Sequence, residues 1–193
     1  MNNKLQAKDL INIGIFTALY FVIFFATGCM GYIPILMVLV PFVCPIVAGI
    51  PMMLYVTKVN KFGMITITGV ICGLLFFATG HSWYPVVLAP ICGLLYDLIL
   101  KAGKYKSAKA IILGYGVFSI WLMAMLCTMA FATDSYLEML TLNYGADYVA
   151  TMNTIIPTWS LPFYGLSAFI GGIVGGLLGK SILKKHFKKA GVV

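Results

Sequence analysis

Side chains that could do chemistry are few in this chain, since charged residues make up only 9% of its 193 residues. His81 stands beside Ser82 and Trp83 between two apolar runs, whereas His186 lies among lysines near the end of the sequence. No serine, histidine and carboxylate are arranged for nucleophilic catalysis, and no H-E-x-x-H motif for a metal occurs. We therefore expect no enzyme activity, no metal site and no cofactor.

One segment imitates a phosphate-binding loop. The run Gly176–Ser181 reads G-L-L-G-K-S, but the motif needs a glycine five residues before Gly179, where the chain has Val174. The motif also follows a β-strand, whereas these residues belong to an apolar stretch that runs into a basic tail. We expect no nucleotide site, so any use of ATP has to come from a partner protein.

Asp97 is the one carboxylate inside a long apolar run. An ionisable residue at membrane depth is by default a functional candidate, for example in a proton relay. Lys101 lies one helical turn further on, and charges at this spacing can pair. We favour a structural ion pair between the two.

A richer set of aromatic and polar residues lies in segments that contain no lysine. Together such side chains suit a pocket for a small, flat molecule, through ring stacking and a few hydrogen bonds. Aromatic residues at this depth are also common as simple membrane anchors. The absence of lysine and arginine argues against a strongly anionic ligand. The pocket candidates, chosen by depth and chemistry, are His81, Trp83, Tyr84, Asn153 and Trp159.

The longest of these segments, residues 133–156, is acidic. In it every fourth residue from Tyr136 to Met152 is aromatic or apolar, which predicts a helical stripe that Gly145 would weaken. Only this lysine-free segment is long enough to cover a site.

The elements that carry these residues are membrane helices. Hydrophobic residues make up 62% of the chain, in runs long enough to cross a bilayer. All thirteen basic residues are lysines, and they fall into four groups beside the runs. The groups are Lys4 and Lys8; Lys58 and Lys61; Lys101, Lys104, Lys106 and Lys109; and Lys180, Lys184, Lys185, Lys188 and Lys189. Lysine in short loops marks the cytoplasmic side.

This pattern predicts an all-α integral membrane protein, a single domain over residues 1–193 with six transmembrane helices and both termini in the cytoplasm. The spans lie near residues 10–27, 33–55, 62–79, 84–100, 110–132 and 157–179. The lysines are explained as a signal for the cytoplasmic side and as contacts to anionic lipids, so we expect no nucleic-acid binding. The first apolar run ends at Cys29 in residues that loosely resemble a lipoprotein cleavage site. This run is longer than the apolar core of a signal peptide, so we expect the first span to be retained.

Prolines and cysteines add two expectations about the spans. Four prolines between Pro34 and Pro51 must make the second span kinked or irregular, and Pro90 should kink the fourth. Such backbone either lines a cavity or merely shapes helix packing, and both interpretations stay open. The five cysteines occur singly and are expected to be buried small residues.

Small residues recur at one-turn spacing on two spans. Gly171, Gly175 and Gly179 form a double GxxxG on the sixth span, which we expect to pack within the chain. Gly14 and Ala18 form a smaller face on the first span, which could pack within the chain or against another subunit.

Over its whole length the chain resembles the substrate-binding S component of an energy-coupling factor (ECF) transporter, a bacterial importer of vitamins and other micronutrients. The shared features are six spans in a short chain, cytoplasmic termini and a small-residue face on the first span. Two stretches are similar more narrowly to the Trep-Strep type of S component. They are G-G-L-L-G-K-S-I-L-K-K-H-F-K-K-A-G and L-L-Y-D-L-I-L-K-A-G-K-Y-K.

The resemblance implies a mechanism in the bacterial plasma membrane. An S component binds its substrate near the outer surface, under loops that act as gate and lid. It then docks on a membrane coupling subunit that two cytosolic ATPases drive, and topples to release the substrate inside. In the family an A-x-x-x-A-like face on the first helix makes the docking contact; here Gly14 and Ala18 occupy that face, with glycine replacing the first alanine. No motif identifies the substrate.

Other functions stay open. A membrane-embedded enzyme would need polar residues clustered at one depth, and the spans offer few. A solitary secondary transporter would need charged residues at mid-depth or inverted repeats, and neither is visible. A small structural or assembly protein would show no ligand pocket.

Overall fold

The computed structural model describes residues 5–189 and 191, so Lys4 lies outside the described residues. Every regular element in this part of the chain is a helix, as predicted. The elements are α1 (Ala7–Gly28), η1 (Cys29–Tyr32), α2 (Pro34–Met37), α3 (Val40–Val56), α4 (Met64–Ala78), α5 (Tyr84–Ala102), α6 (Ala108–Ser119), η2 (Ile120–Leu122), α7 (Met123–Ala130), α8 (Asp134–Tyr144), α9 (Ala146–Ile155), η3 (Thr158–Ser160), α10 (Leu161–Ile182) and α11 (Lys184–Lys189).

Four helical stretches among the described residues are long and apolar enough to cross a membrane. They are Ala7–Tyr32, Tyr84–Ala102, Ala108–Ala130 and Thr158–Ile182. The helices α3 and α4, which coincide with the second and third predicted spans, are apolar but shorter. The count of six spans therefore stays a prediction.

Proline makes the second predicted span irregular, as expected. Pro34 begins the four-residue helix α2, and a turn at residues 38–39 separates it from α3, which has Pro41 in its first turn. Proline is favoured in a first helical turn because its missing N–H has no partner to lose there. Pro45 and Pro51 lie farther along in α3, which continues through both.

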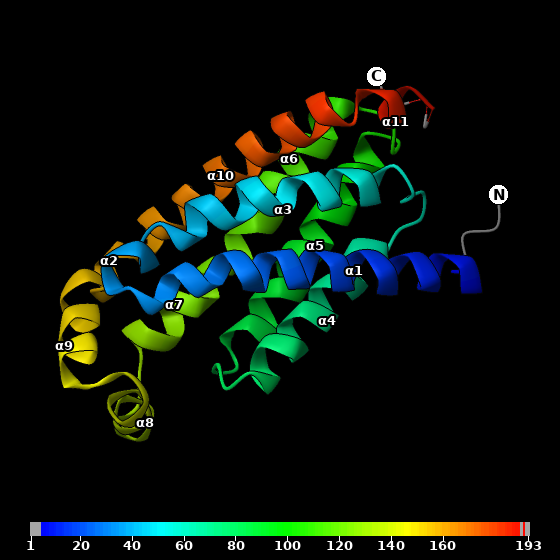
Figure 1. The fold of residues 1–193 in the computed structure, drawn as a ribbon. Helices are drawn as coiled ribbons and strands as arrows, with labels where there is room; N and C mark the ends of the chain where they lie inside the picture. Colours follow the sequence, from blue (N-terminus) through cyan, green and yellow to red (C-terminus); the bar gives the residue numbers. More distant parts are fainter. Residues whose placement is uncertain (1–4, 190, 192–193) are drawn as a thin grey trace.

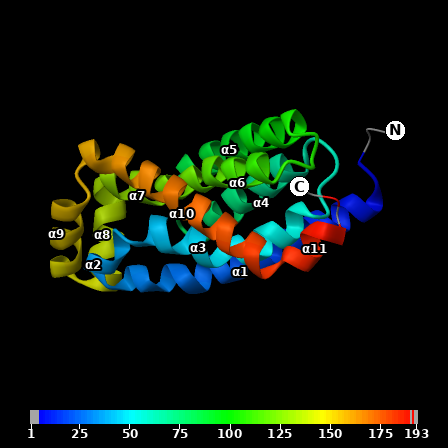
Figure 2. The ribbon, with the colours of Figure 1, turned by 90° about the horizontal axis from the view of Figure 1, so that it is seen from above.

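Close glycine contacts hold the helices together. A Cβ atom on Gly171 or Gly175 of α10 would collide with the backbone of Phe42 or Pro45 in α3, so only glycine permits this approach. The helices α3 and α10 lie side by side in Figures 1 and 2. The prediction that the double GxxxG packs within the chain is confirmed, and it uses the close backbone approach typical of membrane helices.

The ends of the bundle differ in charge. The start of α1 and the helix α11 lie at one end, with the α3–α4 and α5–α6 connections, while α8 and α9 lie at the opposite end (Figures 1 and 2). The described lysines belong to the first end, and Asp134, Glu138 and Asp147 belong to α8 and α9. The predicted charge asymmetry is thus an asymmetry of the folded molecule; which end faces the cytoplasm stays a prediction.

The expected ion pair between Asp97 and Lys101 is wrong. The Asp97 carboxylate is fully buried and accepts four hydrogen bonds at the start of α4. The donors are the N–H groups of Gly63, Ile65 and Thr66 and the hydroxyl of Thr66. The ammonium group of Lys101 lies over the ring of Phe62 instead, 5.5 Å from its centroid. Asp97 fills the role of a helix cap supplied by a neighbouring helix, because the first N–H groups of α4 need an acceptor.

Four of the five cysteines are buried in the apolar interior, as expected: Cys44, Cys72, Cys92 and Cys127. The expectation is wrong for Cys29, which is exposed at the start of η1. It follows the last residue of α1, in the 3₁₀ turn that leads to α2.

Candidate functional site

A cavity of about 320 Å³ lies at the end of the bundle that carries α8 and α9. Its walls come from the end of α1, η1, α2, the end of α4, α7 and the α8–α9 pair, residues 134–155. Rings and thioethers dominate the lining, and four of the rings carry tyrosine hydroxyls. Rings and thioethers come from Phe24, Phe25, Tyr32, Phe76, Tyr136, Tyr144, Tyr148, Met37, Met125, Met129, Met139 and Met152, and further side-chain polar groups from Cys29, Thr79, His81 and Asn143.

Residues of both α8 and α9 line the cavity, and one glycine separates the two helices. Gly145 has φ +88°, a value that suits glycine, and it ends α8 and begins α9. The predicted every-fourth-residue stripe runs through this break, and all five of its members line the cavity. They are Tyr136, Leu140, Tyr144, Tyr148 and Met152.

Few polar contacts fasten this pair to the bundle. The hydroxyl of Tyr148 donates to the carbonyl of Gly31 at 3.0 Å, and the ring of Tyr144 lies 6.0 Å from that of Tyr32. At the far end of α9, the hydroxyl of Tyr164 donates to the carbonyl of Ile155 at 2.8 Å. The pair is otherwise held by apolar contacts, since Leu140, Val149 and Met152 belong to one buried cluster with Leu126 and Met129 of α7.

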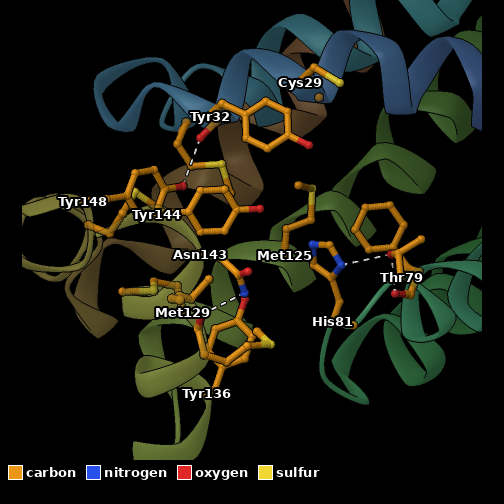
Figure 3. Close-up of a pocket in the computed structure, with 18 of the residues that line it drawn as sticks. Cys29, Tyr32, Thr79, His81, Met125, Met129, Tyr136, Asn143, Tyr144 and Tyr148 are labelled. Atoms are coloured by element: carbon orange, nitrogen blue, oxygen red, sulfur yellow. Dashed lines mark hydrogen bonds between the residues drawn. The ribbon is translucent and has the colours of Figure 1, made fainter. Parts of the chain in front are cut away.

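Among the described residues that line the cavity, His81 is the one with an imidazole ring. Its ring lies 4.3 Å from that of Phe76, and its Nδ1 is 3.2 Å from the hydroxyl oxygen of Thr79. Burial lowers the pKa of His81 to about 4, so the ring is neutral at pH 7. Figure 3 shows His81 and Thr79 across the cavity from Tyr144 and Tyr148. No lysine lines the cavity, so its described walls carry no positive charge at neutral pH.

A second cavity of about 350 Å³ adjoins the first. It lies between residues 80–82 and residues 128–139, and the two cavities share His81, Tyr136 and Met139 among their walls. His81 of the loop after α4 and Tyr136 and Met139 of α8 therefore lie between the two spaces.

The structure places the five predicted pocket residues in different surroundings. His81 lines the cavity, whereas the other four line neither cavity. Trp83 is 57% exposed and stacks on Tyr84 at 4.5 Å, Asn153 is exposed, and Trp159 is 72% exposed. Ligand binding by any of these five residues stays a prediction. The signal that marks the cavity in the sequence is the every-fourth-residue stripe of the 133–156 segment.

The small-residue face of α1 points away from the bundle. Gly14 and Ala18 are exposed, and a Cβ atom on Gly14 would meet nothing within 4 Å. Gly175 on α10 is the opposite case, because α3 already occupies its space. Large apolar side chains flank the face, all more than 40% exposed: Leu10, Ile11, Ile15, Leu19 and Val22. In the described part of the chain nothing covers this face.

Two features of the described residues concern cofactor binding. Within residues 5–189, no group of three or more histidine, cysteine, aspartate or glutamate side chains could hold a metal ion. The phosphate-loop lookalike Gly176–Ser181 lies inside α10, where helical N–H groups bond along the helix and cannot cradle a phosphate.

Comparison with protein families gives a match over most of the chain. Residues 7–189 match the family model described as hypothetical bacterial integral membrane protein (Trep_Strep). No curated protein and no solved structure matches the chain. The match covers nearly all of the described helices, and its description agrees with their apolar character. The chain therefore belongs to the Trep_Strep family of bacterial integral membrane proteins.

Proposed function

We propose that this protein is the substrate-binding subunit of an ECF-type importer in the bacterial plasma membrane. The observation that carries the proposal is the cavity under the α8–α9 pair, at the end opposite the lysine-bearing connections. If those connections are cytoplasmic, as lysine in short loops indicates, the cavity opens toward the outside. A capture site at the outer surface is what an importer needs.

The cavity indicates the class of substrate. A volume of about 320 Å³ is at the small end of ligand pockets, which measure roughly 300–1,000 Å³, so it suits one small molecule. Aromatic faces and polarisable thioethers favour a flat ring system. Because the lining has no lysine and His81 is neutral, we expect a neutral or cationic substrate, such as a vitamin-like micronutrient.

The energy for transport would come from outside this chain. Its one nucleotide-like motif is part of a helix, so the proposal includes a membrane coupling subunit and two cytosolic ATPases as partners. The exposed face around Gly14 and Ala18 would dock on the coupling subunit, since small residues let two membrane helices approach closely.

The structure gives a reason to prefer this function over a solitary proton-coupled transporter. Such a carrier needs an ionisable group at mid-depth that is free to change its protonation state. Asp97, the carboxylate available for this, is committed to capping α4 through four hydrogen bonds. A membrane-embedded enzyme is the second alternative, and the cavity lining offers it one histidine and no carboxylate.

Mass spectrometry of the small molecules that co-purify with the protein tests the proposal. We expect one compound near one mole per mole of wild-type protein. Tyr144→Ala removes a ring from the cavity and Cys29→Trp fills part of it, so both should lower the retained amount at least tenfold. The matched controls Leu142→Ala and Trp159→Phe alter highly exposed residues outside the cavity and should retain it.

Two results would count against the proposal. Absence of any retained compound, together with uptake by cells that does not depend on ATPases, would favour a solitary carrier. Loss of the compound in Trp159→Phe but not in Tyr144→Ala would move the site to the exposed aromatic residues that the sequence suggested.

A further inference from the structure

Two polar atoms in the middle of the bundle lack partners. Among the residues that the structure describes, the hydroxyl of Tyr20 and the indole N–H of Trp121 have no hydrogen-bond partner. Both side chains are at least 99% buried. Buried side-chain donors without a partner are rare in native proteins, and each costs about 1–3 kcal/mol. Two of them in one place need a physical explanation.

The unpartnered pair lies directly beneath the cavity. The indole N–H of Trp121 is a polar group near the Tyr20 hydroxyl, but the two do not reach the geometry of a hydrogen bond. The rings of Phe24 and Phe76, which form the cavity floor, each lie 5.5 Å from the Trp121 ring and 5.3 Å from one another. Met125, one turn after Trp121, lines the cavity. A single layer of phenylalanine rings thus separates the cavity from two unsatisfied polar groups.

The backbone around Trp121 is suited to movement. The helix that starts at α6 tightens into the 3₁₀ segment η2 at Ile120–Leu122 before it continues as α7. A 3₁₀ stretch inside a longer helix is a frequent mark of a hinge. The deep polar pair and the irregular backbone therefore coincide.

We propose that Trp121 and Tyr20 form the deep polar end of the ligand site, which opens when the rings of Phe24 and Phe76 move apart. The ligand inserts a flat ring between these phenylalanines and presents a neutral hydrogen-bond acceptor, a ring nitrogen or a carbonyl oxygen, to the indole N–H. The tyrosine hydroxyl donates to, or accepts from, a second polar atom of the ligand. This inference rests on the proposed function, because it extends the same capture site and specifies its ligand class.

A pair of isosteric probes tests the acceptor requirement. Quinoline and naphthalene have the same shape, but only quinoline carries a ring nitrogen that accepts a hydrogen bond. The protein in detergent, labelled with ¹⁵N in its tryptophans, gives one indole N–H signal for each of Trp83, Trp121 and Trp159. We expect quinoline to shift the Trp121 signal downfield and naphthalene to leave it closer to its starting position. Equal shifts with both probes, or no shift with either, would overturn the proposal.

Tyr20→Phe is the matched variant, because it removes the hydroxyl and keeps the ring. It should raise the melting temperature of the free protein, since it eliminates an unsatisfied buried group. Quinoxaline has the shape of quinoline and a second ring nitrogen that can accept from the Tyr20 hydroxyl, so Tyr20→Phe should weaken quinoxaline binding about fivefold and leave quinoline binding unchanged. Tyr115→Phe is the control: that hydroxyl is equally buried but donates to the Pro45 carbonyl at 2.7 Å. It should lower the melting temperature and leave the binding of both quinoline and quinoxaline unchanged.

The two variants also separate this inference from the proposed function. Unchanged quinoxaline affinity in Tyr20→Phe would overturn the inference even if a natural compound co-purifies with the wild type. A quinoline-specific shift of Trp121 would support the inference even if cells show no ATPase-dependent uptake.

Discussion

Replacement of Asp97 by asparagine gives the most decisive test of how the helices are joined. The carboxylate lies on α5 and caps α4 with bonds of 2.7 Å to the Thr66 hydroxyl, 2.8 Å to the Thr66 N–H and 3.1 Å to the Gly63 N–H, and a longer one to Ile65. Asparagine keeps the shape but supplies one acceptor oxygen, and its amide group would point a donor at other donors.

The structure sets the size of the effect. A hydrogen bond to a charged group contributes about 1.5–3 kcal/mol, and leaving a buried donor unpaired costs about 1–3 kcal/mol. Loss of one or two of these bonds gives a destabilisation of about 3–5 kcal/mol. Native proteins have about 5–15 kcal/mol in total, so the expected fall in melting temperature is about 10 °C.

The buried cysteines provide the assay. A dye that fluoresces on reaction with thiols reports unfolding, because four cysteines are inaccessible until the bundle opens. Cys29 is replaced by serine to remove the background from the exposed thiol. Asp134→Asn is the control, since Asp134 is exposed in α8 and should shift the midpoint by no more than about 2 °C. Lys101→Met distinguishes the two accounts of Asp97. If Lys101→Met lowers the midpoint as far as Asp97→Asn does, the ion pair is real and the capping account is wrong.

Three further predictions concern docking, closure and pH. Gly14→Leu should abolish uptake and leave the fold and the retained ligand intact, because the leucine side chain enters open space. Gly175→Leu should prevent folding, because α3 fills the space beside Gly175. Equal folding of the two variants would contradict this packing. Tyr148→Phe removes the bond to the Gly31 carbonyl and should speed ligand dissociation about fivefold, measured by dilution and rapid filtration, and an unchanged rate would mean that α9 is not a closure element. The folded-state pKa of His81 is about 4, below the ordinary value of 6.5, so the unfolded state binds more protons between these two pH values. The stability of the wild type should therefore fall from pH 6.5 to 4 more steeply than that of His81→Gln. If the melting temperatures of the two proteins change in parallel over this range, the histidine is not buried.

The sequence is informative about the helices because membrane burial requires long apolar runs. It also predicted the irregular second span, since proline removes backbone donors wherever it occurs. The spacing of the glycines in α10 was also informative, because small residues at one-turn spacing usually allow close packing between membrane helices. The spacing could not say which neighbour they meet, and Gly14 has the same kind of spacing with no neighbour in this chain.

The site was less predictable. Its floor comes from Phe24 and Phe76, whose apolar character marks them equally well as core residues. The exposed aromatic residues Trp83 and Trp159 are chemically better candidates, yet the turns at the ends of their helices direct them away from the cavity. Asp97 shows the same limit, because its donors lie more than thirty positions earlier in the chain, beyond any local spacing rule.

The central claim is that the cavity under α8 and α9 opens to the outside of the cell, away from the lysine-bearing end. Cys29 lines that cavity and is exposed, while the other four cysteines are buried, so a membrane-impermeant maleimide reports its side directly.

The decisive measurement is labelling in intact cells, with Lys106→Cys in a Cys29→Ser background as the marker for the opposite end. The account predicts that Cys29 is labelled in intact cells, that compounds extracted from the purified protein slow this labelling, and that Lys106→Cys is labelled only after permeabilisation. Labelling of Lys106→Cys in intact cells, with Cys29 reacting only after permeabilisation, would contradict it.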